Sequence, residues 1–461
     1  MKEISVMISP TDNCNINCSY CYNLPRRIKH GRKVIERKAV EQTLRLVNEY
    51  VEAPMTQLVW HGGEPLLMGI EWFKDVQPLL FKYSTNTLWD QGIQTNATLL
   101  NEDWIRFIKD HNISISTSYD VFSQGLRERE NIVWGNIVQM LKNGIRPGII
   151  TGVNSSNCTQ MIQMYEFFKE RYIGGFCFNP AYILEDAPPD AQRLKLDPHM
   201  YVREWERYLR HWLNDFSDRI IFERTIMEAL AVVVSSLDQP CGTRDCQTEY
   251  LTVNCNGDIT TCNRYCPDRY ILGNIMDCSD ISDVYESEGY KSYVQAIEER
   301  KARKCGDCSY LPYCRGGCKL NHMLKASGFD RDCCVSFTGT FDATYNLIRE
   351  LRLEDPRINH VLFGLLASDE FFTVPEIKKF IYTIGYPGEI EYNGKDIPNC
   401  TEFRLFGVFN SRLSKRIIHQ IPMRKYSGDM LRDEGYRQHR NSCMMSVYRD
   451  NARLIHEILD N

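Results

Sequence analysis

Short hydrophobic segments alternate with amphipathic segments along the first 180 residues of the chain. The hydrophobic segments are rich in β-branched and aromatic residues, and several segments between them place apolar residues at helical spacing. Strands that alternate with helices in this way form βα units in which the strands run parallel. The pattern predicts an α/β fold in which six strands form a partial (β/α)6 barrel. The expected strands are 2–9, 56–62, 91–96, 113–120, 148–154 and 174–180, and helices are expected at 35–52, 131–143 and 159–171.

The remainder of the chain divides into a cysteine-rich zone and a zone that is nearly free of cysteine. A helical segment, 198–236, precedes residues 241–334, which are dense in cysteine and in short turns. Because this zone has too few apolar runs for an ordinary core, we expect bound metal to hold it together. An amphipathic helix is expected near 338–352. We therefore predict three domains, which are a barrel with linking helices over 1–235, a cysteine-rich domain over 236–345 and an α+β extension of unknown role over 346–461.

The composition is that of a globular protein, with 43% hydrophobic and 25% charged residues in a chain of 461. No run of about 18 apolar residues is present, so we expect no membrane span. The start of the chain, MKEISVMISP, lacks the apolar core of a signal peptide, which predicts a cytoplasmic location. The net charge of -5 disfavours binding to nucleic acid, since affinity for phosphate backbones comes from clustered Lys and Arg.

Three of the nineteen cysteines lie within eight positions, directly after the first expected strand. In the stretch TDNCNINCSYCYN, Cys14, Cys18 and Cys21 have the spacing C-x3-C-x2-C. In a reducing cytosol, clustered thiols bind metal or perform redox chemistry more often than they form structural disulfides. A cubane of four irons normally takes four thiolates, so three thiolates leave one iron open for a ligand. A three-cysteine zinc site with a distant fourth ligand, or a chance group of thiols, is the alternative interpretation.

With an aromatic residue before the third cysteine, this motif resembles the signature of the radical S-adenosylmethionine (SAM) superfamily. The resemblance implies a TIM-like partial barrel and a 4Fe-4S cluster held by the three cysteines. The open iron of that cluster would chelate the amino and carboxylate groups of SAM. Further SAM-binding positions are implied at the ends of the second, third and fourth strands. The implied SAM-binding residues are Tyr20, Gly62, Gly63, Glu64, Pro65, Asn96 and Ser118.

Each of these strand ends also has an ordinary structural interpretation. The segment WHGGEP matches the family's GGEP element, which pairs with the SAM ammonium group, because a carboxylate suits a cation and a glycine pair permits close approach. It is otherwise a turn. Ser118 resembles the serine of the family's S-x-D-G strand end, although Val121 replaces the glycine, and the alternative is a plain strand end. Asn96, in QTNA, occupies a TNG-like position, and turns also favour asparagine.

The cysteines of residues 241–334 follow a second ordered pattern. Gly257 and Cys262 give G-x4-C, and four later cysteines give C-x2-C-x5-C-x3-C. This order resembles the SPASM domain of radical SAM enzymes that modify peptides, which carries two auxiliary clusters. A pair of structural zinc ribbons is the alternative interpretation. The resemblance implies that Cys241, Cys246, Cys262 and Cys318 hold the first auxiliary cluster, while Cys305, Cys308, Cys314 and either Cys333 or Cys334 hold the second.

Seven other cysteines fall outside these sets. Four are scattered along the chain and are expected to be small core residues. Three lie inside the SPASM-like zone but off its pattern, so an exchange of ligands is left open there. The scattered cysteines are Cys158, Cys177, Cys400 and Cys443, and those off the pattern are Cys255, Cys266 and Cys278.

The chemistry that the resemblance implies is a radical oxidation with three 4Fe-4S clusters and SAM as cofactors. A reducing partner such as flavodoxin or ferredoxin would reduce the N-terminal cluster, which then cleaves SAM to a 5′-deoxyadenosyl radical. That radical abstracts hydrogen from unactivated carbon, and the protein supplies position and excludes water. The auxiliary clusters would accept a further electron. We therefore expect a net oxidation of a polypeptide side chain.

One position bears on which oxidation occurs. Anaerobic sulfatase-maturing enzymes share this layout and use an Asp directly after the G-x4-C cysteine as general base, but this chain has Asn263 there. An amide cannot accept that proton, although Asp258 and Asp268 are near in sequence. Since the cysteines suffice to close both auxiliary clusters, thioether formation is also disfavoured. We predict oxidative crosslinking of a ribosomally made precursor peptide, with formylglycine formation, thioether formation and a non-enzymatic iron-sulfur or zinc scaffold as alternatives.

Overall fold

The chain divides into two compact units in the computed structural model. Unit 1 comprises Met1–Glu204 and Cys241–Phe337, and unit 2 comprises Trp205–Pro240 and Thr338–Asn461. The three-domain division of the sequence stays a prediction. The structure describes residues 4–31, 33–122, 126–171, 173, 175–181, 183, 187–214, 222–226, 229, 246–264, 268–318, 339–344 and 346–347.

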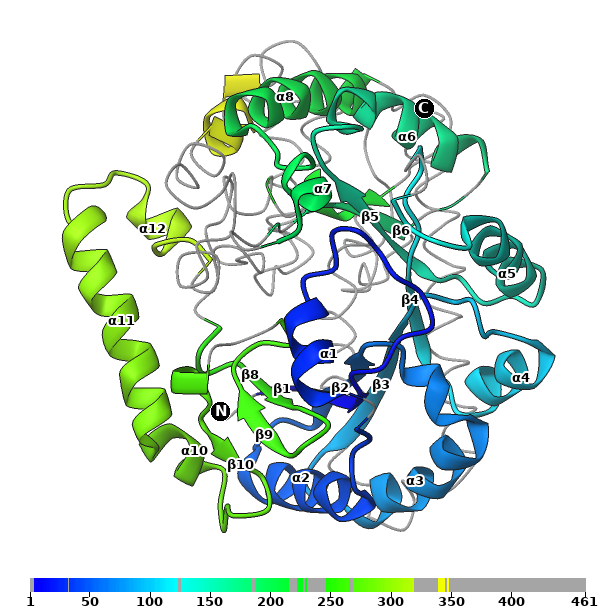
Figure 1. Ribbon diagram of the computed structural model, residues 1–461, viewed down its shortest axis with the longest axis vertical. Helices are drawn as coiled ribbons and strands as arrows, with labels where there is room; N and C mark the ends of the chain where they lie inside the picture. The colour runs from blue at the N-terminus through cyan, green and yellow to red at the C-terminus, as the bar shows by residue number, and fades with distance from the viewer. Residues whose placement is uncertain are drawn as a thin grey trace, which may run out of the picture. The chain divides into compact units, whose positions relative to one another are not determined.

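A parallel sheet forms the centre of unit 1 (Figure 1). Its first six strands follow the order of the chain, and each pairs parallel with the next. The predicted α/β fold with a parallel sheet is confirmed, and the strand order is linear, so the sheet does not close. The strands are β1 (Ser5–Thr11), β2 (Met55–Gly62), β3 (Leu88–Thr95), β4 (Ser114–Ser118), β5 (Gly148–Val153) and β6 (Gly175–Pro180).

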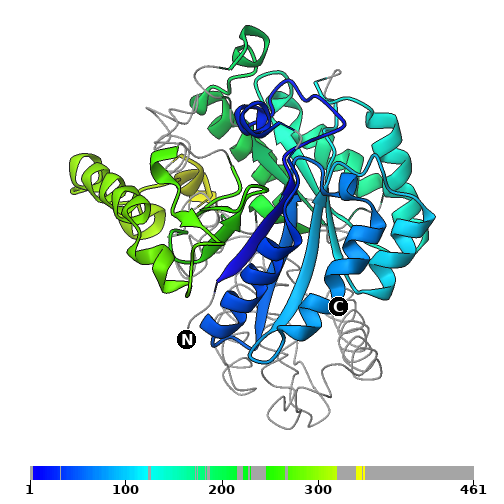
Figure 2. The same ribbon diagram turned by 60° about the horizontal axis from the view of Figure 1, so that its bottom comes forward.

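Helices connect successive strands, and α2 to α6 lie along the outer face of the sheet (Figures 1 and 2). Such crossovers between parallel strands are the expected connection of βα units. The helices predicted at 35–52, 131–143 and 159–171 are confirmed as α2, α5 and α6. The helices of this region are α1 (Leu24–His30), α2 (Arg37–Tyr50), α3 (Ile70–Lys82), α4 (Glu102–Asp110), α5 (Glu130–Lys142), α6 (Met161–Glu170) and α7 (Pro189–Gln192), with 3-10 helices η1 (Pro65–Met68) and η2 (Cys158–Gln160).

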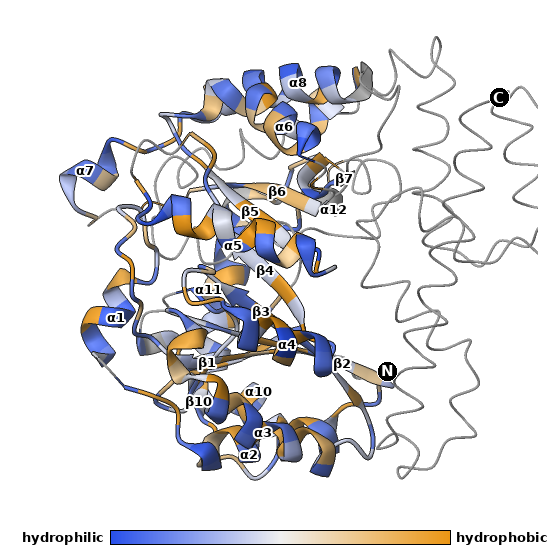
Figure 3. Ribbon diagram, turned by 90° about the vertical axis from the view of Figure 1, so that its right-hand side faces the viewer, coloured by the Kyte–Doolittle hydropathy of each residue, from blue (hydrophilic) through white to orange (hydrophobic). Residues whose placement is uncertain are grey.

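Aromatic side chains pack α3 and α4 against β2. Trp60 of β2 and Phe73 of α3 are fully buried, and their ring centroids lie 5.7 Å apart in an edge-on arrangement. Phe73 makes a similar contact with Trp104 of α4 at 5.3 Å. Each edge-to-face pair adds about 0.5 to 1.5 kcal/mol to the stabilisation from burial alone. Figure 3 shows that α3 carries both hydrophilic and hydrophobic positions, as an amphipathic helix requires.

The cysteine-rich zone extends this sheet beyond β1. Strand β8 pairs parallel with β1, with Ser5 opposite Tyr250, and β9 and β10 continue the sheet antiparallel. The sequence patterns did not predict these three short strands. The zone contains β8 (Tyr250–Val253), β9 (Asp258–Thr260), η3 (Asp268–Tyr270), β10 (Gly273–Asn274), α10 (Ser282–Glu286), α11 (Glu288–Lys304) and α12 (Leu311–Cys314).

The helical segment predicted at 198–236 is only partly confirmed. Helix α8 covers Pro198–Asn214, but β7 (Phe222–Glu223) is a strand. The carboxylate of Glu223 is fully buried and accepts hydrogen bonds from the backbone N–H groups of Thr225 and Ile226. This side chain therefore acts as an N-cap for the helical residues that follow it, so a new helical segment begins here. Helical residues lie within 339–347, inside the segment predicted near 338–352, and residues 348–461 lie outside the described part. No helix among the described residues is both long and apolar enough to cross a membrane.

Helix α11 packs so closely on the segment before β10 that it requires glycine at its second position. A Cβ atom on Gly289 would lie 1.9 Å from the carbonyl oxygen of Ile271. We expect Gly289→Ala to destabilise the protein by about 1 to 3 kcal/mol, as overpacking does, and to lower its apparent unfolding temperature. Gly135→Ala in α5 is the matched control, because apart from its chain neighbours and the backbone of its own helix no atom lies within 4 Å of the added Cβ. An unfolding temperature that is the same in both variants would contradict this packing.

Candidate active site

The three N-terminal cysteines lie in a loop that follows β1. A backbone hydrogen bond from Cys21 N to Cys18 O, at 3.2 Å, closes the loop into a tight turn. Burial raises the pKa of Cys14, and it raises the pKa of Cys18 to about 12. A charge on Cys21 raises the pKa of Cys14 and of Cys18 further. Three thiolates in this loop therefore repel one another unless a cation compensates their charge. The sulfur donors and their electrostatics therefore fit a cationic iron-sulfur cluster.

The glycine pair after β2 lies directly against this cysteine loop. Gly63 N donates to Thr11 O at 2.9 Å, and Glu64 N donates to Asn13 O at 2.8 Å. A Cβ atom on Gly63 would lie 2.2 Å from Asn13 O and 2.5 Å from Asp12 O. Gly63 therefore packs directly against the backbone of the cysteine loop. Any residue with a side chain at this position would clash with that backbone.

The side chain of Glu64 is fully buried beneath the same loop. Its Oε1 accepts hydrogen bonds from Leu66 N and from the Thr95 hydroxyl, and its Oε2 accepts one from Asn96 N. Burial raises the pKa of Glu64 to about 7, although these hydrogen bonds oppose the shift. The carboxylate thus ties the GGEP turn to the end of β3. Its pairing with the SAM ammonium group stays a prediction.

The predicted residues at the ends of β3 and β4 have different surroundings. Asn96 Nδ2 donates to Asn15 Oδ1 at 2.8 Å and approaches Cys14 Sγ at 3.6 Å, so this side chain contacts the cysteine loop. Ser118 lies at the end of β4, where its hydroxyl accepts a hydrogen bond from Gln94 Nε2 at 3.2 Å. The structure therefore brings Asn96 to a cluster cysteine and gives Ser118 a partner on the neighbouring strand.

A buried arginine that the sequence analysis missed joins the cysteine loop to the end of β4. Arg127 Nη2 donates to the Tyr20 hydroxyl at 3.3 Å, and its Nε pairs with Asp120 Oδ2 at 3.2 Å. Asp120 is 3% exposed, so it needs a cationic partner. The positive charge also lowers the pKa of Cys18, against the larger effect of burial. In the sequence, the only sign of this arginine's role is Asp120, the acidic residue of the S-Y-D strand end, which needs a cationic partner when it is buried.

The cysteines predicted for the first auxiliary cluster gather around Tyr293. Cys318 and Tyr293 belong to one buried cluster, against which Cys262 packs. Burial raises the pKa of Tyr293, and the thiols of Cys246, Cys262 and Cys318 raise it further. Arg264 Nη2 donates to Cys318 Sγ at 2.7 Å and supplies a positive charge beside this group. The fourth predicted ligand, Cys241, lies outside the described residues.

Three of the cysteines predicted for the second auxiliary cluster lie between the end of α11 and the end of α12. Cys308 N donates to Cys305 O at 3.1 Å, and Cys314 N donates to Tyr310 O at 2.7 Å. These bonds mark one turn at Cys305–Cys308 and another that ends at Cys314. The side chains of Cys305 and Cys314 are buried, whereas that of Cys308 is exposed. Cys333 and Cys334, the candidates for the fourth ligand, lie outside the described residues.

The cysteines that fall off the SPASM pattern have other partners. Cys255 Sγ donates to Asp12 Oδ2 at 3.1 Å, and Cys278 Sγ donates to Asn274 O at 3.4 Å. Cys158 and Cys177 are buried, as expected for small core residues. Cys266, Cys400 and Cys443 lie outside the described residues.

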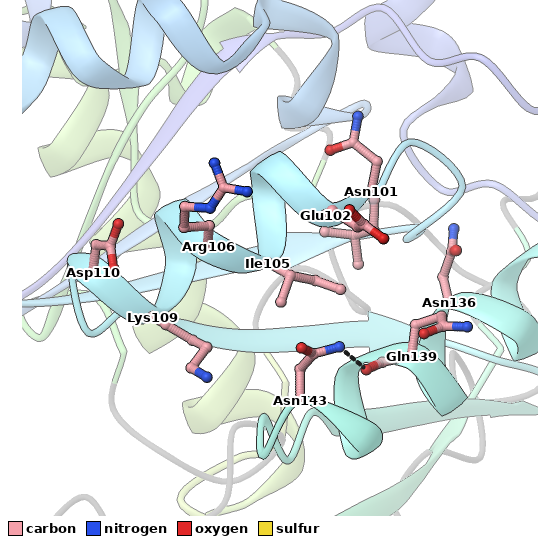
Figure 4. Close-up of a pocket in the computed structure, with 10 residues that line it drawn as sticks. Asn101, Glu102, Ile105, Arg106, Lys109, Asp110, Asn136, Gln139 and Asn143 are labelled. Atoms are coloured by element: carbon pink, nitrogen blue, oxygen red, sulfur yellow. Dashed lines mark hydrogen bonds between the residues drawn. The ribbon is translucent and has the colours of Figure 1, made fainter.

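A pocket between α4 and α5 has no cysteine among its lining residues (Figure 4). It has a volume of about 570 Å³ and is lined mainly by charged and amide side chains, among them Arg106, Lys109 and Gln139. None of its lining residues is a predicted cofactor residue. The cysteine loop therefore remains the candidate site.

Two segments of the sequence match known domain families. Residues 8–157 match the Radical SAM superfamily, and residues 241–309 match SPASM, an iron-sulfur cluster-binding domain. The cysteine-type anaerobic sulfatase-maturating enzyme of Clostridium novyi (strain NT) is 26% identical over 361 residues, which cover 74% of this chain and 95% of that protein.

Solved structures show the same fold. Native anSMEcpe with bound AdoMet and Cp18Cys peptide has a TM-score of 0.65 at 21% identity, and the match covers 76% of this chain and 98% of that one. SuiB of Streptococcus suis bound to precursor peptide SuiA has a TM-score of 0.51 at 17% identity, covering 70% of this chain and 73% of that one.

The two family matches coincide with the two groups of cysteines in the structure. The first match contains the three-cysteine loop and the GGEP turn that packs against it. The second contains Cys246 and Cys262 and extends past Cys308. The chain is therefore an enzyme that carries a Radical SAM domain and an iron-sulfur-binding SPASM domain.

Proposed function

We propose that this enzyme oxidises an unactivated side-chain carbon of a ribosomally made precursor peptide and joins that carbon to a second side chain. A carbon–carbon link to an aromatic ring, as in a cyclophane, is the favoured product. The observation that carries the proposal is Asn263, which stands beside Cys262 where a formylglycine-forming enzyme of this layout would have its general base.

A peptide substrate is supported by the names of similar proteins. The relative from Clostridium novyi is a sulfatase-maturating enzyme. Structures with the same fold contain the Cp18Cys peptide or the precursor peptide SuiA. We infer that the substrate of this chain is also a peptide, and that a reducing partner such as flavodoxin or ferredoxin supplies its electrons.

The cysteine loop would hold the SAM-binding cluster through Cys14, Cys18 and Cys21. The cluster and SAM together supply a radical that abstracts hydrogen from unactivated carbon. The chain's own side chains hold the loop in place. Asn96 contacts the Cys14 sulfur from the end of β3, and Arg127 fixes Tyr20 against the end of β4. Such contacts around metal ligands fix their orientation.

Among the described residues, the contacts of Asn263 do not include a general base. Its backbone carbonyl accepts a hydrogen bond from Arg26 Nη1 at 2.9 Å, and its amide oxygen lies 3.8 Å from Cys262 Sγ. Neither group takes a proton at neutral pH. The nearest acidic residues in sequence have partners of their own. Asp258 accepts hydrogen bonds from Asn256 and Asn274, and Asp268 pairs with Lys29.

Formylglycine formation is the second candidate, because the relative from Clostridium novyi is named for sulfatase maturation and covers most of this chain. It would require a base that the described residues beside Cys262 do not offer. Thioether formation is the third candidate, and it would require an auxiliary cluster with an open iron.

The cluster assignment predicts about twelve irons per chain after anaerobic purification, in three four-iron clusters. Changing Cys14, Cys18 and Cys21 together to Ala should remove about a third of this iron and all reductive cleavage of SAM. Iron analysis and detection of 5′-deoxyadenosine measure both effects. Cys278→Ser is the matched control, because this buried thiol donates to Asn274 O and should not bind iron. Zinc in place of iron, or iron that survives the triple change, would argue against the assignment.

The crosslinking proposal predicts a product lighter than its precursor peptide by two hydrogen atoms for each modification. The product should not react with a hydrazide probe, since it contains no aldehyde, and its fragment spectrum should show two linked side chains. Mass spectrometry of the peptide encoded beside this chain's gene provides the measurement.

The same assay on sulfatase-type peptides with Ser or Cys provides the control. We expect no hydrazide-reactive product from them, and none after Asn263→Asp, because substrate placement also depends on the rest of the site. A formylglycine aldehyde made by the unaltered enzyme would overturn the crosslinking proposal in favour of the second candidate.

A further inference from the structure

A buried cluster of four side chains lies between the cysteine loop and the segment that follows β8. Its members are Asp12, Arg26, His30 and Cys255, and we refer to it as the Asp12 cluster. Asp12 stands two positions before Cys14, Arg26 and His30 lie on α1, and Cys255 lies in the turn between β8 and β9. Neither the radical SAM motif nor the SPASM cysteine pattern includes these residues.

The carboxylate of Asp12 is the centre of the cluster and is 1% exposed. Arg26 Nε forms an ion pair with Oδ1 at 2.9 Å, and His30 Nδ1 lies 2.7 Å from Oδ2. Cys255 Sγ donates to the same Oδ2 at 3.1 Å. Burial and the neighbouring carboxylate raise the pKa of Cys255 to about 12, so the thiol keeps the proton that it donates.

The guanidinium of Arg26 reaches beyond Asp12 to a second loop. Its Nη1 donates to Asn254 Oδ1 at 2.7 Å and to the backbone oxygen of Asn263 at 2.9 Å. The side chain is 4% exposed, and its Nη2 has no hydrogen-bond partner among the described residues. Arg26 therefore connects the residue two before Cys14 to the residue directly after Cys262.

We propose that Arg26 is a positioning residue that fixes the separation between the SAM-cluster loop and the loop of the first auxiliary cluster. The inference rests on the proposed function only in assigning Cys262 to that auxiliary cluster. If the first auxiliary cluster accepts an electron from the substrate, the rate of that transfer would depend on this separation. A rigid link between the two loops would therefore set the path by which the oxidation is completed.

The chemistry of arginine suits this role. Its planar guanidinium presents several donors in a fixed fork, so one side chain can hold a carboxylate and a carbonyl at a defined distance. A lysine ammonium offers a single nitrogen and cannot place donors at both ends of this link. Because the arginine and Asp12 are both buried, each also compensates the other's charge.

A divalent cation is the other occupant that Asp12, His30 and Cys255 suggest, since their ligand atoms lie within 4.8 Å of one another. Two observations argue against it. The Arg26 guanidinium already contacts the same carboxylate, and its charge would repel a cation. The separations of 2.7 and 3.1 Å around Oδ2 are those of direct hydrogen bonds.

The test compares Arg26→Leu and Arg26→Lys with Lys29→Leu in the full-length enzyme loaded with iron. Lys29 is the matched control, because it also links α1 to the cysteine-rich zone, through Asp268, but both side chains of this pair are substantially exposed. The magnetic coupling between the two reduced clusters is read from electron paramagnetic resonance, since dipolar coupling falls with the cube of the distance. No peptide is needed, so failure of the crosslinking proposal would not affect this result.

We expect both Arg26 variants to keep their iron but to show a changed coupling, and Lys29→Leu to match the unaltered enzyme. Arg26→Lys retains a cation for Asp12, so it tests the link even if Arg26→Leu does not fold. Unchanged coupling in Arg26→Lys would overturn the proposal. One zinc per chain that disappears in Cys255→Ser would also overturn it, because the cluster would then be a metal site.

Discussion

The parallel pairing of β1 with a strand on each side is the constraint on which the rest of the site depends. β1 lies between β2 and β8, and both run in its direction. Parallel neighbours end at the same edge of a sheet, so the cysteine loop lies between the loop after β2 and the loop after β8. The first loop supplies the backbone contacts of Gly63 and Glu64. The second supplies Asn254 and Cys255, which reach Arg26 and Asp12.

The balance of buried charges determines what can bind at the edge of the sheet where β1, β2 and β8 end. Two of its buried carboxylates have guanidinium partners, Asp12 with Arg26 and Asp120 with Arg127. Glu64 instead accepts three hydrogen bonds and has its pKa raised to about 7 by burial. Arg26 and Arg127 are therefore engaged by carboxylates, and burial still raises the pKa of Cys14 and Cys18. Three ionised cysteines need a further source of positive charge. An iron-sulfur cluster provides it, which couples deprotonation of the thiols to binding of the metal.

The sequence predicted the features that depend on local patterns. The six parallel strands were predicted because short β-rich segments alternate with amphipathic helical segments. The cysteine loop was predicted from its spacing, its aromatic residue and its place after the first strand. The strands β8 and β9 were missed because four and three residues carry no usable period. Arg26 and Arg127 were missed because their roles come from contacts across 228 and 107 positions of the chain. Their only local signal is a nearby carboxylate at a strand end.

We infer that the cysteine loop holds a cluster whose open iron binds SAM. Electron-nuclear double resonance on the reduced enzyme with SAM labelled at its amino nitrogen and carboxylate oxygens tests it most directly. We expect hyperfine coupling from both labels to the reduced N-terminal cluster, in a spectrum that the variants of Cys14, Cys18 and Cys21 lack. Tight SAM binding without coupling from either label would contradict it, because the cofactor would then lie away from the iron.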